Sequence, residues 1–429
     1  MSPITDISTN FPIENPNIES TQELILNEFG SVIDEANRQE STGYFYTKII
    51  NGAYRVVDPQ GYLHTIKNVS TPLPILDTPN SIQISNSKKE AVDLFDTEHW
   101  KNQTQDIMLG AYFNCFEHYY NLITENKFCY NKMNRISKFP ILDSWAREFE
   151  LNSFERPKLC NILHPKFKER AHFKVKQILV KQPQKSSNIV AYTLDNEPIF
   201  DREDLLNCLY TQNNTLNYRK EAAEVWLKNR LNSEDISIVD ITEELNDEFL
   251  SFEFYVYSKI ITDEIKAMDT NHMIFSPALQ WYKFSEHKGF LQNNDNFFKV
   301  LNKFYDAMAF THYSTYDIFN EGLNNLKLNI PVFLNEFSLK GLDKPEFEDV
   351  LAGPAVATQK ERAKYFEFIA SQCLKHKNCI GYTWYQYSDI ALTNGGIVNR
   401  GIVDPDGNPY PELYESMKKI NSNAELLQQ

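Results

Sequence analysis

The chain has 429 residues, of which 42% are hydrophobic, 13% aromatic and 24% charged, a composition that supports a large core and excludes the disordered and fibrous classes. Its formal net charge at pH 7 is −15, and no basic stripe opposes that acidity, which argues against a nucleic-acid or membrane partner. The six cysteines form no CxxC motif and no cluster with histidines, so we expect free, mostly buried thiols and no zinc site.

The N-terminus lacks the basic and apolar regions of a signal peptide. No stretch of the sequence approaches the roughly 18 consecutive apolar residues that a membrane-spanning helix needs. A cytoplasmic protein is therefore the default expectation, with secretion without a cleaved signal left open.

Residues 1–43 are predicted to form an N-terminal arm with a peripheral helix over Thr21–Ala36, where apolar residues recur at helical spacing. Two short β runs follow, Tyr44–Ile50 and Tyr54–Val57. They are joined by Asn51-Gly52, the strongest short signal for a β-hairpin.

Beyond the hairpin, short apolar runs alternate with long helical segments, including predicted helices at Trp100–Tyr120 and Ala222–Leu231. Eight such runs are the number that closes a (β/α)₈ barrel. We therefore predict an α/β fold, an elaborated TIM barrel over residues 44–421 with a short N-terminal arm and hairpin, followed by a C-terminal tail at residues 422–429. The eight runs are Leu63–Val69, Phe149–Phe154, Leu159–Leu163, Ile189–Leu194, His272–Ser276, Ala307–Thr311, Pro331–Leu334 and Ile380–Trp384.

Two of these runs end in the same dipeptide, Asn-Glu. The fourth run is followed by Asn196-Glu197 and the seventh by Asn335-Glu336. In such barrels catalytic groups lie where strands end, so both glutamates should face one barrel mouth. Glycosidic bond cleavage needs two facing carboxyl groups, one protonated to assist the leaving oxygen and one ionised to attack the anomeric carbon. The alternative is that both are surface loop acids, as most glutamates are.

Other strand ends carry polar and aromatic residues that suit a saccharide. The phenol of Tyr313 follows the sixth run and is placed to hydrogen-bond a carboxylate on the next strand. Trp384 ends the eighth run and offers an indole face for stacking on a sugar, although a tryptophan there also suits a barrel plug. The predicted substrate contacts are Asn68, Asn196, His312, Tyr313, Trp384, Gln386 and Asp389.

Several motifs occur in a characteristic order: Tyr192-Thr193-Leu194-Asp195-Asn196-Glu197, then Asn335-Glu336-Phe337-Ser338, then Gly381-x-x-Trp384-Tyr385-Gln386-Tyr387-x-Asp389, and Asn399-x-Gly401-Ile402-Val403-Asp404. With them the sequence resembles the β-agarase-like branch of the clan-A retaining glycoside hydrolases over nearly all of residues 44–421. The resemblance implies that Glu197 is the acid/base and Glu336 the nucleophile, with Asn196, Tyr313 and Trp384 shaping the subsite of the cleaved residue. The sequence departs from the family at Ser276–Trp281, where an arginine contact to substrate is missing.

These observations predict a retaining β-glycosidase for a galactose- or glucose-type oligo- or polysaccharide, working without a metal or organic cofactor. Another clan-A enzyme, such as a β-galactosidase or a mannan- or glucan-cleaving enzyme, is the alternative within enzymes. The alternative from another class is a carbohydrate-binding barrel that has lost catalysis. A metal-dependent deacetylase or nuclease is weaker, because the strand ends carry no His/Asp ligand cluster.

Overall fold

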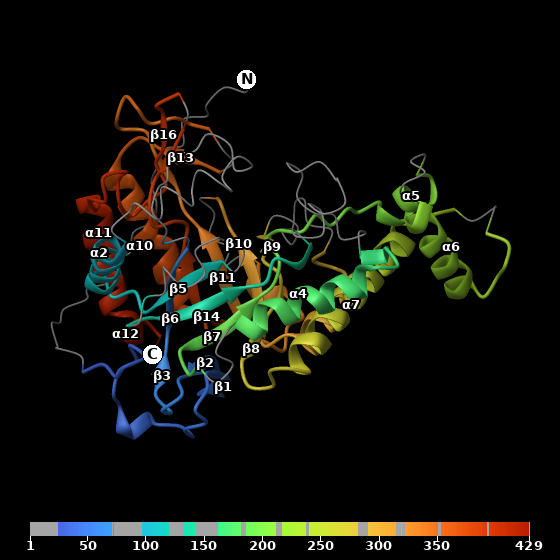
Figure 1. Ribbon diagram of the computed structural model, residues 1–429, viewed down its shortest axis with the longest axis horizontal. Coiled ribbons are helices and arrows are strands. Elements are labelled where there is room, and N and C mark those ends of the chain that lie inside the picture. The colour runs from blue at the N-terminus through green and yellow to red at the C-terminus, as the bar shows by residue number, and fades with distance from the viewer. Residues whose placement is uncertain are drawn as a thin grey trace.

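A curled sheet of nine parallel strands forms the centre of the computed structural model (Figure 1). Its strand order is β8-β7-β6-β5-β4-β14-β11-β10-β9. A parallel bridge between Phe275 and Ala307 joins β8 to the segment that leads into β10. The strands are β4 (Ile66–Val69), β5 (Cys115–Tyr119), β6 (Asn134–Lys138), β7 (Ile189–Thr193), β8 (Met273–Phe275), β9 (Leu279–Gln280), β10 (Met308–Thr311), β11 (Val332–Phe337) and β14 (Cys379–Trp384).

The structure describes most, but not all, of the chain. The described residues are 25–70, 72, 97–119, 130, 132–142, 162–181, 186–211, 217–236, 240–281, 291–314, 319, 322–350, 353–392 and 394–428.

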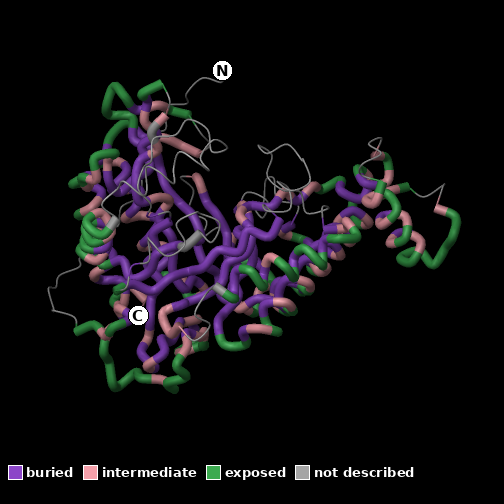
Figure 2. The backbone as a smooth tube through the Cα atoms, viewed as in Figure 1, coloured by how far each residue is buried: buried purple, intermediate pink, exposed green. Residues whose placement is uncertain are grey.

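Alternation along the strands divides the core into an inner and an outer layer. Along β11, for example, Phe333 belongs to the inner cluster, whereas Val332 and Leu334 belong to the outer one. The sheet is therefore buried on both faces, and Figure 2 shows it as continuously buried. The inner cluster includes Ile66, Cys115, Ile136, Val190, Ala191, Met273, Phe275, Ala307, Ala309, Phe333 and Ile380.

Six of the eight predicted strands are confirmed, but the second and third were misplaced. The second and third strands of the series are β5 and β6. The predicted run Phe149–Phe154 lies outside the described residues, as does most of Leu159–Leu163, and Ile162 and Leu163 form a helical turn. The predicted helix Trp100–Tyr120 was too long, because α2 (Thr97–Gly110) ends before β5 begins.

A small antiparallel sheet of β1 (Tyr46–Ile50), β2 (Ala53–Val57) and β3 (Leu63–His64) confirms the predicted hairpin. Asn51 and Gly52 at its turn both have positive φ, 52° and 78°, as a tight two-residue hairpin requires. Phe45 and Val56 belong to the inner cluster, so the hairpin joins its apolar side to the interior of the curled sheet.

The predicted N-terminal helix is not formed in residues 25–36, and its first four residues lie outside the described chain. Leu26 and Val32 instead form an antiparallel bridge, followed by a 3₁₀ turn, η1 (Glu35–Asn37). The side chain of Asn27 accepts hydrogen bonds from the backbone N–H groups of Phe29 and Ser31. These local bonds compete with helical ones and explain the turn.

Helices cover the sheet on its outer side, and the sequence beyond β11 adds short strand pairs. The remaining elements near the sheet are α8 (Asp295–Phe304), η5 (Leu323–Asn325), β12 (Lys340–Gly341), β13 (Ala355–Val356), α10 (Gln359–Lys375), β15 (Ile390–Ala391), β16 (Ile397–Val398), α11 (Pro411–Ser422) and α12 (Ala424–Leu427). α12 falls in the stretch predicted as a tail, and Thr65 donates to the side chain of the following residue, Gln428, at 2.8 Å.

A helical arm projects to one side of the sheet, formed by α4 (Phe167–Lys181), α5 (Asp204–Leu209), α6 (Asn217–Leu231) and α7 (Glu243–Lys266) (Figure 1). The predicted helix Ala222–Leu231 lies within α6 and is confirmed. A separate small cluster of Leu205, Cys208, Ala223, Leu227 and Phe249 joins α5 and α6 to α7.

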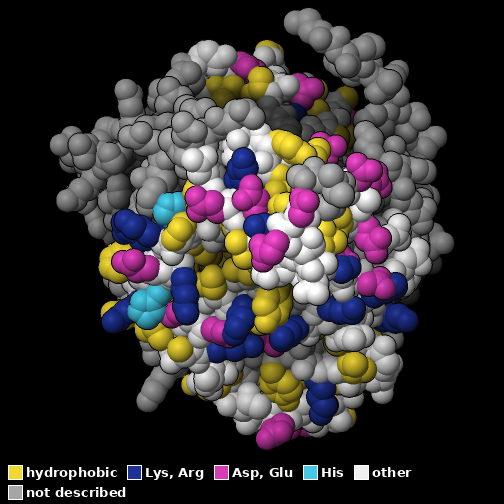
Figure 3. Space-filling model, turned by 90° about the vertical axis from the view of Figure 1, so that its right-hand side faces the viewer, with side chains coloured by type: hydrophobic (Ala, Val, Ile, Leu, Met, Phe, Trp, Pro, Cys, Tyr) yellow, Lys and Arg dark blue, Asp and Glu magenta, His cyan; other side chains and the backbone are white. Residues whose placement is uncertain are grey.

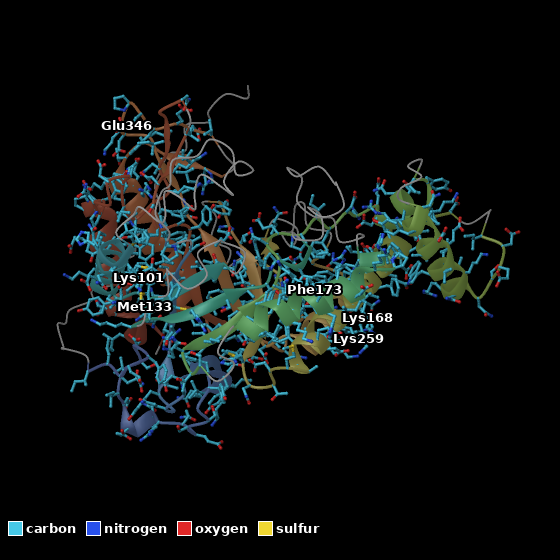
Figure 4. All side chains as sticks on the ribbon, in the orientation of Figure 1. Lys101, Met133, Lys168, Phe173, Lys259 and Glu346 are labelled. Carbon is cyan, nitrogen blue, oxygen red and sulfur yellow. The ribbon has the colours of Figure 1, made fainter. Side chains whose placement is uncertain are left out.

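The surface of the arm is mixed in character. Lys168 and Phe173 on α4 and Lys259 on α7 lie along it (Figure 4). The face seen from the end of the arm intersperses side chains of both charge signs with apolar ones (Figure 3). Among the described helices, none combines the length and apolarity that crossing a bilayer demands.

Candidate active site

A layer of polar side chains lies on the inner face of the sheet, just beyond the inner apolar cluster toward the carboxyl ends of the strands. Residues two positions apart on a strand share a face, so each polar residue follows an inward apolar one. The pairs are Ile66/Asn68, Cys115/Glu117, Ile136/Lys138, Ala191/Thr193, Ala309/Thr311 and Phe333/Asn335. All six polar members are buried.

Glu336 stands at the centre of this layer, on β11, with 3% of its surface exposed. The phenol of Tyr313 donates to its Oε2 at 2.8 Å, as the sequence predicted. The ammonium of Lys138 lies 3.4 Å from its Oε1. Burial raises the pKa of Glu336 to about 7, and the charges of Glu197 and Glu117 add to that increase, while Lys138 and Tyr313 oppose it.

Glu197 lies directly after β7, is 4% exposed and has a positive φ of 45°, an uncommon conformation for a residue with a side chain. Its backbone N–H donates to the carbonyl of Ala278 at 3.0 Å. Thr311 donates to its Oε1 at 2.5 Å, and Gln280 to its Oε2 at 3.4 Å. Gln280 belongs to the segment in which the sequence departs from the agarase-like family, and there it contacts this carboxylate.

Thr311 connects the two glutamates. Its Cα pairs with that of Glu336, because β11 has one extra residue at this point and Asn335 has no partner on β10. Its hydroxyl meanwhile bonds Glu197. The chain thus brings Glu197 and Glu336, 139 residues apart in sequence (336 minus 197), to the same buried site.

Asp195, two residues before Glu197, holds the end of β7 in place. It accepts a hydrogen bond from the backbone N–H of Leu142 at 2.7 Å and one from the phenol of Tyr257 at 2.8 Å. Tyr257 lies on α7, so the longest helix of the arm fixes the segment that carries Glu197.

Lys138 and Glu117 are site residues that sequence reasoning missed. Lys138 ends β6, and its Nζ lies 2.9 Å from Glu117 Oε1 and 3.2 Å from Asn196 Oδ1. Glu117 also accepts a hydrogen bond from Ser70. Their strands, Cys-Phe-Glu-His-Tyr and Asn-Arg-Ile-Ser-Lys, are too polar to be found as apolar runs. Both strands do carry a recognisable signal, an apolar residue followed two positions later by a charged one.

Trp384 is placed differently from the prediction of a rim platform. It is fully buried and packs edge-on against Phe337 and Phe366, on the outer face of the sheet. An indole with no exposed surface offers no face to a sugar, and a place on the outer face of the sheet is not that of a plug inside the barrel either. The next residue, Tyr385, is half-buried and meets the ring of Tyr313 edge-on, with 6.3 Å between centroids. The aromatic side chain at the site is therefore one residue later than expected.

Asp389, predicted to contact substrate, is engaged by the protein. Asn399 donates to both of its oxygens at 3.0 Å, the backbone N–H of Gly401 to Oδ1 at 2.7 Å, and Tyr410 to Oδ2 at 2.5 Å. It is 1% exposed, so its role in the structure is to fix the loop that follows β14.

The other predicted contacts vary in placement. Asn196 lies beside Lys138 at the site. The side chain of Gln386 donates to the carbonyl of Ser388 at 2.8 Å. His312 is buried, and its backbone N–H donates to the carbonyl of Glu336 at 2.8 Å. The amide nitrogen of Asn68 donates to the hydroxyl of Thr383 at 2.9 Å. The Oδ1 of Asn68 is buried and has no hydrogen-bond partner among the described residues. No group of three or more His, Cys, Asp or Glu side chains in the described ranges is arranged to hold a metal ion.

Comparison with known proteins finds similarity both in sequence and in structure. No family model matches the chain. Over 132 residues, 28% of the chain, it is 26% identical to β-agarase B of Vibrio sp. (strain JT0107), and the matched segment is only 14% of that protein.

Solved structures match over much more of the chain. The crystal structure of BpGH50 covers 94% of this chain and 86% of its own, with a TM-score of 0.72 and 20% identity. The agarase AgWH50C (94% and 66%, TM-score 0.69, 17% identity) and an exo-β-agarase (94% and 68%, TM-score 0.70, 16% identity) are also similar. The chain shares the fold of these proteins.

Proposed function

We propose that the protein is a retaining glycoside hydrolase that cleaves β-linked saccharides of agar type. The observation that carries this proposal is the pair of buried glutamates, Glu197 and Glu336, joined through Thr311 at the carboxyl ends of the strands. Enzymes on this kind of scaffold place their chemistry at that end of the sheet. The shared fold with agarases supports the substrate class.

We also infer that the curled sheet is the (β/α)₈ barrel predicted from the sequence, with β9 as an accessory strand, and that the chain belongs to clan A. The Phe275–Ala307 bridge supports closure, because it links β8 to the segment entering β10. Each of the eight main strands also contributes to one inner cluster, as the strands of a closed barrel do.

In the proposed reaction, Glu336 attacks the anomeric carbon while Glu197 gives its proton to the leaving glycosidic oxygen. The bond from the anomeric carbon to that oxygen breaks as the glycosyl ester with Glu336 forms. In the second half, Glu197 removes a proton from water, which attacks the same carbon and releases Glu336. Product keeps its anomeric configuration, and no cofactor enters either step.

Catalysis needs Glu336 ionised and Glu197 protonated. The phenol of Tyr313 and the ammonium of Lys138 favour charge on Glu336, as a nucleophile requires. We expect the two carboxyl groups to be about 5–5.5 Å apart, as in retaining enzymes.

Two isosteric variants test the proposed roles. Glu336→Gln should abolish turnover of every substrate, whereas Glu197→Gln should lower kcat/KM on natural saccharides by roughly 10²–10⁴-fold and lower it far less on activated aryl glycosides, whose departure in the first step needs little protonation. Glu415→Gln, on the exposed face of α11, is the matched control. Steady-state rates on an aryl β-galactoside and on agar oligosaccharides measure the difference.

Proton NMR of the first-formed sugar checks the stereochemical course. A product of inverted configuration would refute double displacement. Binding of agar oligosaccharides without any turnover of aryl or natural substrates would instead identify a carbohydrate-binding barrel that has lost catalysis.

A further inference from the structure

Lys138 occupies an unusual position for a lysine, with its side chain 1% exposed on the inner face of the sheet. Its ammonium has three N–H donors, and three oxygens surround it: Glu117 Oε1 at 2.9 Å, Asn196 Oδ1 at 3.2 Å and Glu336 Oε1 at 3.4 Å. A buried charge is tolerated only when it is paired and hydrogen-bonded, and this arrangement provides both.

Glu117 is the nearer of the two carboxylates to this cation. Ser70 and Lys138 hold it in place from β4 and β6, on either side of its own strand. Neither step of the proposed reaction uses Glu117. Its position lets it share the positive charge that would otherwise act on Glu336 alone.

We propose that Lys138 is a positioning residue that keeps Glu336 ionised, and that Glu117 limits this effect by competing for the same ammonium. The predicted effect on catalysis rests on the proposed function. The predicted effect on the ionisation of Glu336 depends only on the charges of Lys138, Glu117 and Glu336 themselves. It makes a prediction of opposite sign for the two partners, which a purely structural role does not.

Other charged or titratable groups also face Glu336, and they are the same in the wild type and in the Lys138 and Glu117 variants. They are Glu197 after β7, Tyr313 after β10 and Tyr385 after β14, and the guanidinium of Arg400 lies over the ring of Tyr313, 5.0 Å from its centroid. Only Lys138 and Glu117 are changed, so a shift in titration reports on those two.

The kinetic experiment follows the acid limb of the pH profile of kcat/KM on an activated aryl glycoside. Lys138→Met should move this limb upward by roughly 1 to 3 pH units, because Glu336 loses its nearest cation. Lys138→Arg should restore most of the original profile. Glu117→Gln should move the limb downward, because it removes both the repulsion that Glu117 exerts on Glu336 and its competition for the ammonium.

Lys67→Met is the matched control. Lys67 is a buried lysine on β4, two strands from β6 in the sheet, but its Nζ lies 3.4 Å from Glu425, on the outer side of the sheet. Its removal should leave the acid limb unchanged, whatever it does to stability.

A second readout needs no turnover. In protein labelled with ¹³C at the glutamate carboxyls, the Glu336 resonance is the one lost in Glu336→Gln, and its titration midpoint should rise in Lys138→Met and fall in Glu117→Gln. If the midpoints move in this way but no saccharide is cleaved, the proposed function fails and the inference stands.

Equal loss of rate at all pH values in Lys138→Met, with unchanged midpoints, would reduce Lys138 to a structural residue and overturn the inference. So would shifts of the same sign in both variants. If Lys138→Met does not fold, Glu117→Gln decides alone, because glutamine keeps the shape of the side chain and an acceptor for Ser70.

Discussion

Burial of Glu336 creates a conflict at the scale of a single residue. Its site is built to hold a carboxylate that water barely reaches, and desolvation favours the neutral form. Lys138 and Tyr313 reduce this effect but do not cancel it, since the pKa remains raised to about 7. A side chain that is held in an unfavourable environment is expected at a reactive site, where function and stability compete.

The conflict predicts a pH-dependent stability difference for Glu336→Gln. The unfolded chain loses this proton near pH 4.5 and the folded chain near pH 7, so the wild type loses up to roughly 3 kcal/mol of stability as pH rises through that window. Glutamine has no such loss. The melting temperature of the variant minus that of the wild type should therefore increase from pH 4.5 to 7.5 and then level off.

Thermal unfolding across this pH range measures the difference, with Glu415→Gln on the surface of α11 as the control. A difference that stays constant with pH, or that shrinks toward neutral pH, would show that the Glu336 carboxylate is well accommodated in the fold.

At the scale of elements, strand β7 and helix α7 are joined at the site by one polar contact. Tyr257, fully buried on α7, donates to Asp195, which precedes Asn196 and Glu197. Helix α7 continues outward through the arm. The small apolar cluster that holds α5 and α6 packs against its first turns. The helix thus connects a distant module to the backbone that carries Glu197.

Tyr257→Phe should destabilise the fold by about 1–3 kcal/mol, because a buried carboxylate loses a hydrogen-bond donor while the ring volume is kept. Chemical denaturation measures the loss. Tyr255→Phe, a half-buried residue of the same helix whose ring packs on Phe304, is the control and should change stability little. Equal effects from the two variants would mean that the Asp195 contact contributes nothing specific.

At the scale of the whole molecule, the apolar core is divided. Two clusters lie inside and outside the sheet, and a third, small one holds α5 and α6 against α7 in the arm. A small core with few buried residues supports a low local free energy of opening. Helices α5 and α6 should therefore open without the sheet.

Leu227→Ala, at a buried position of α6, removes about 2–5 kcal/mol from that small core. Hydrogen exchange should become faster in α5 and α6, with exchange in α10 and α11 unchanged. Val225→Ala, an exposed position on the same helix, should leave all four helices unchanged. Faster exchange throughout the sheet in Leu227→Ala would instead show that arm and sheet unfold as one unit.

Sequence alone determined the features that depend on local pattern. Apolar runs located six of the eight main strands, Asn51-Gly52 located the hairpin, and the repeated Asn-Glu at two strand ends selected both glutamates that the fold brings together. These predictions succeed because alternation, turn chemistry and strand-end position can be recognised from residues that are neighbours in the sequence.

Only the tertiary structure decided which side chains surround that pair. Glu117 and Lys138 lie on strands whose polarity is explained by the residues they face, so an apolar pattern could not find them. The choice between Trp384 and Tyr385 depends on which face of β14 meets the outer helices, a one-residue difference that reverses inside and outside. The ionisation of Glu336 likewise depends on burial, on the charges of Lys138, Glu197 and Glu117 and on the hydrogen bond from Tyr313, and these are set only when the chain closes around the site.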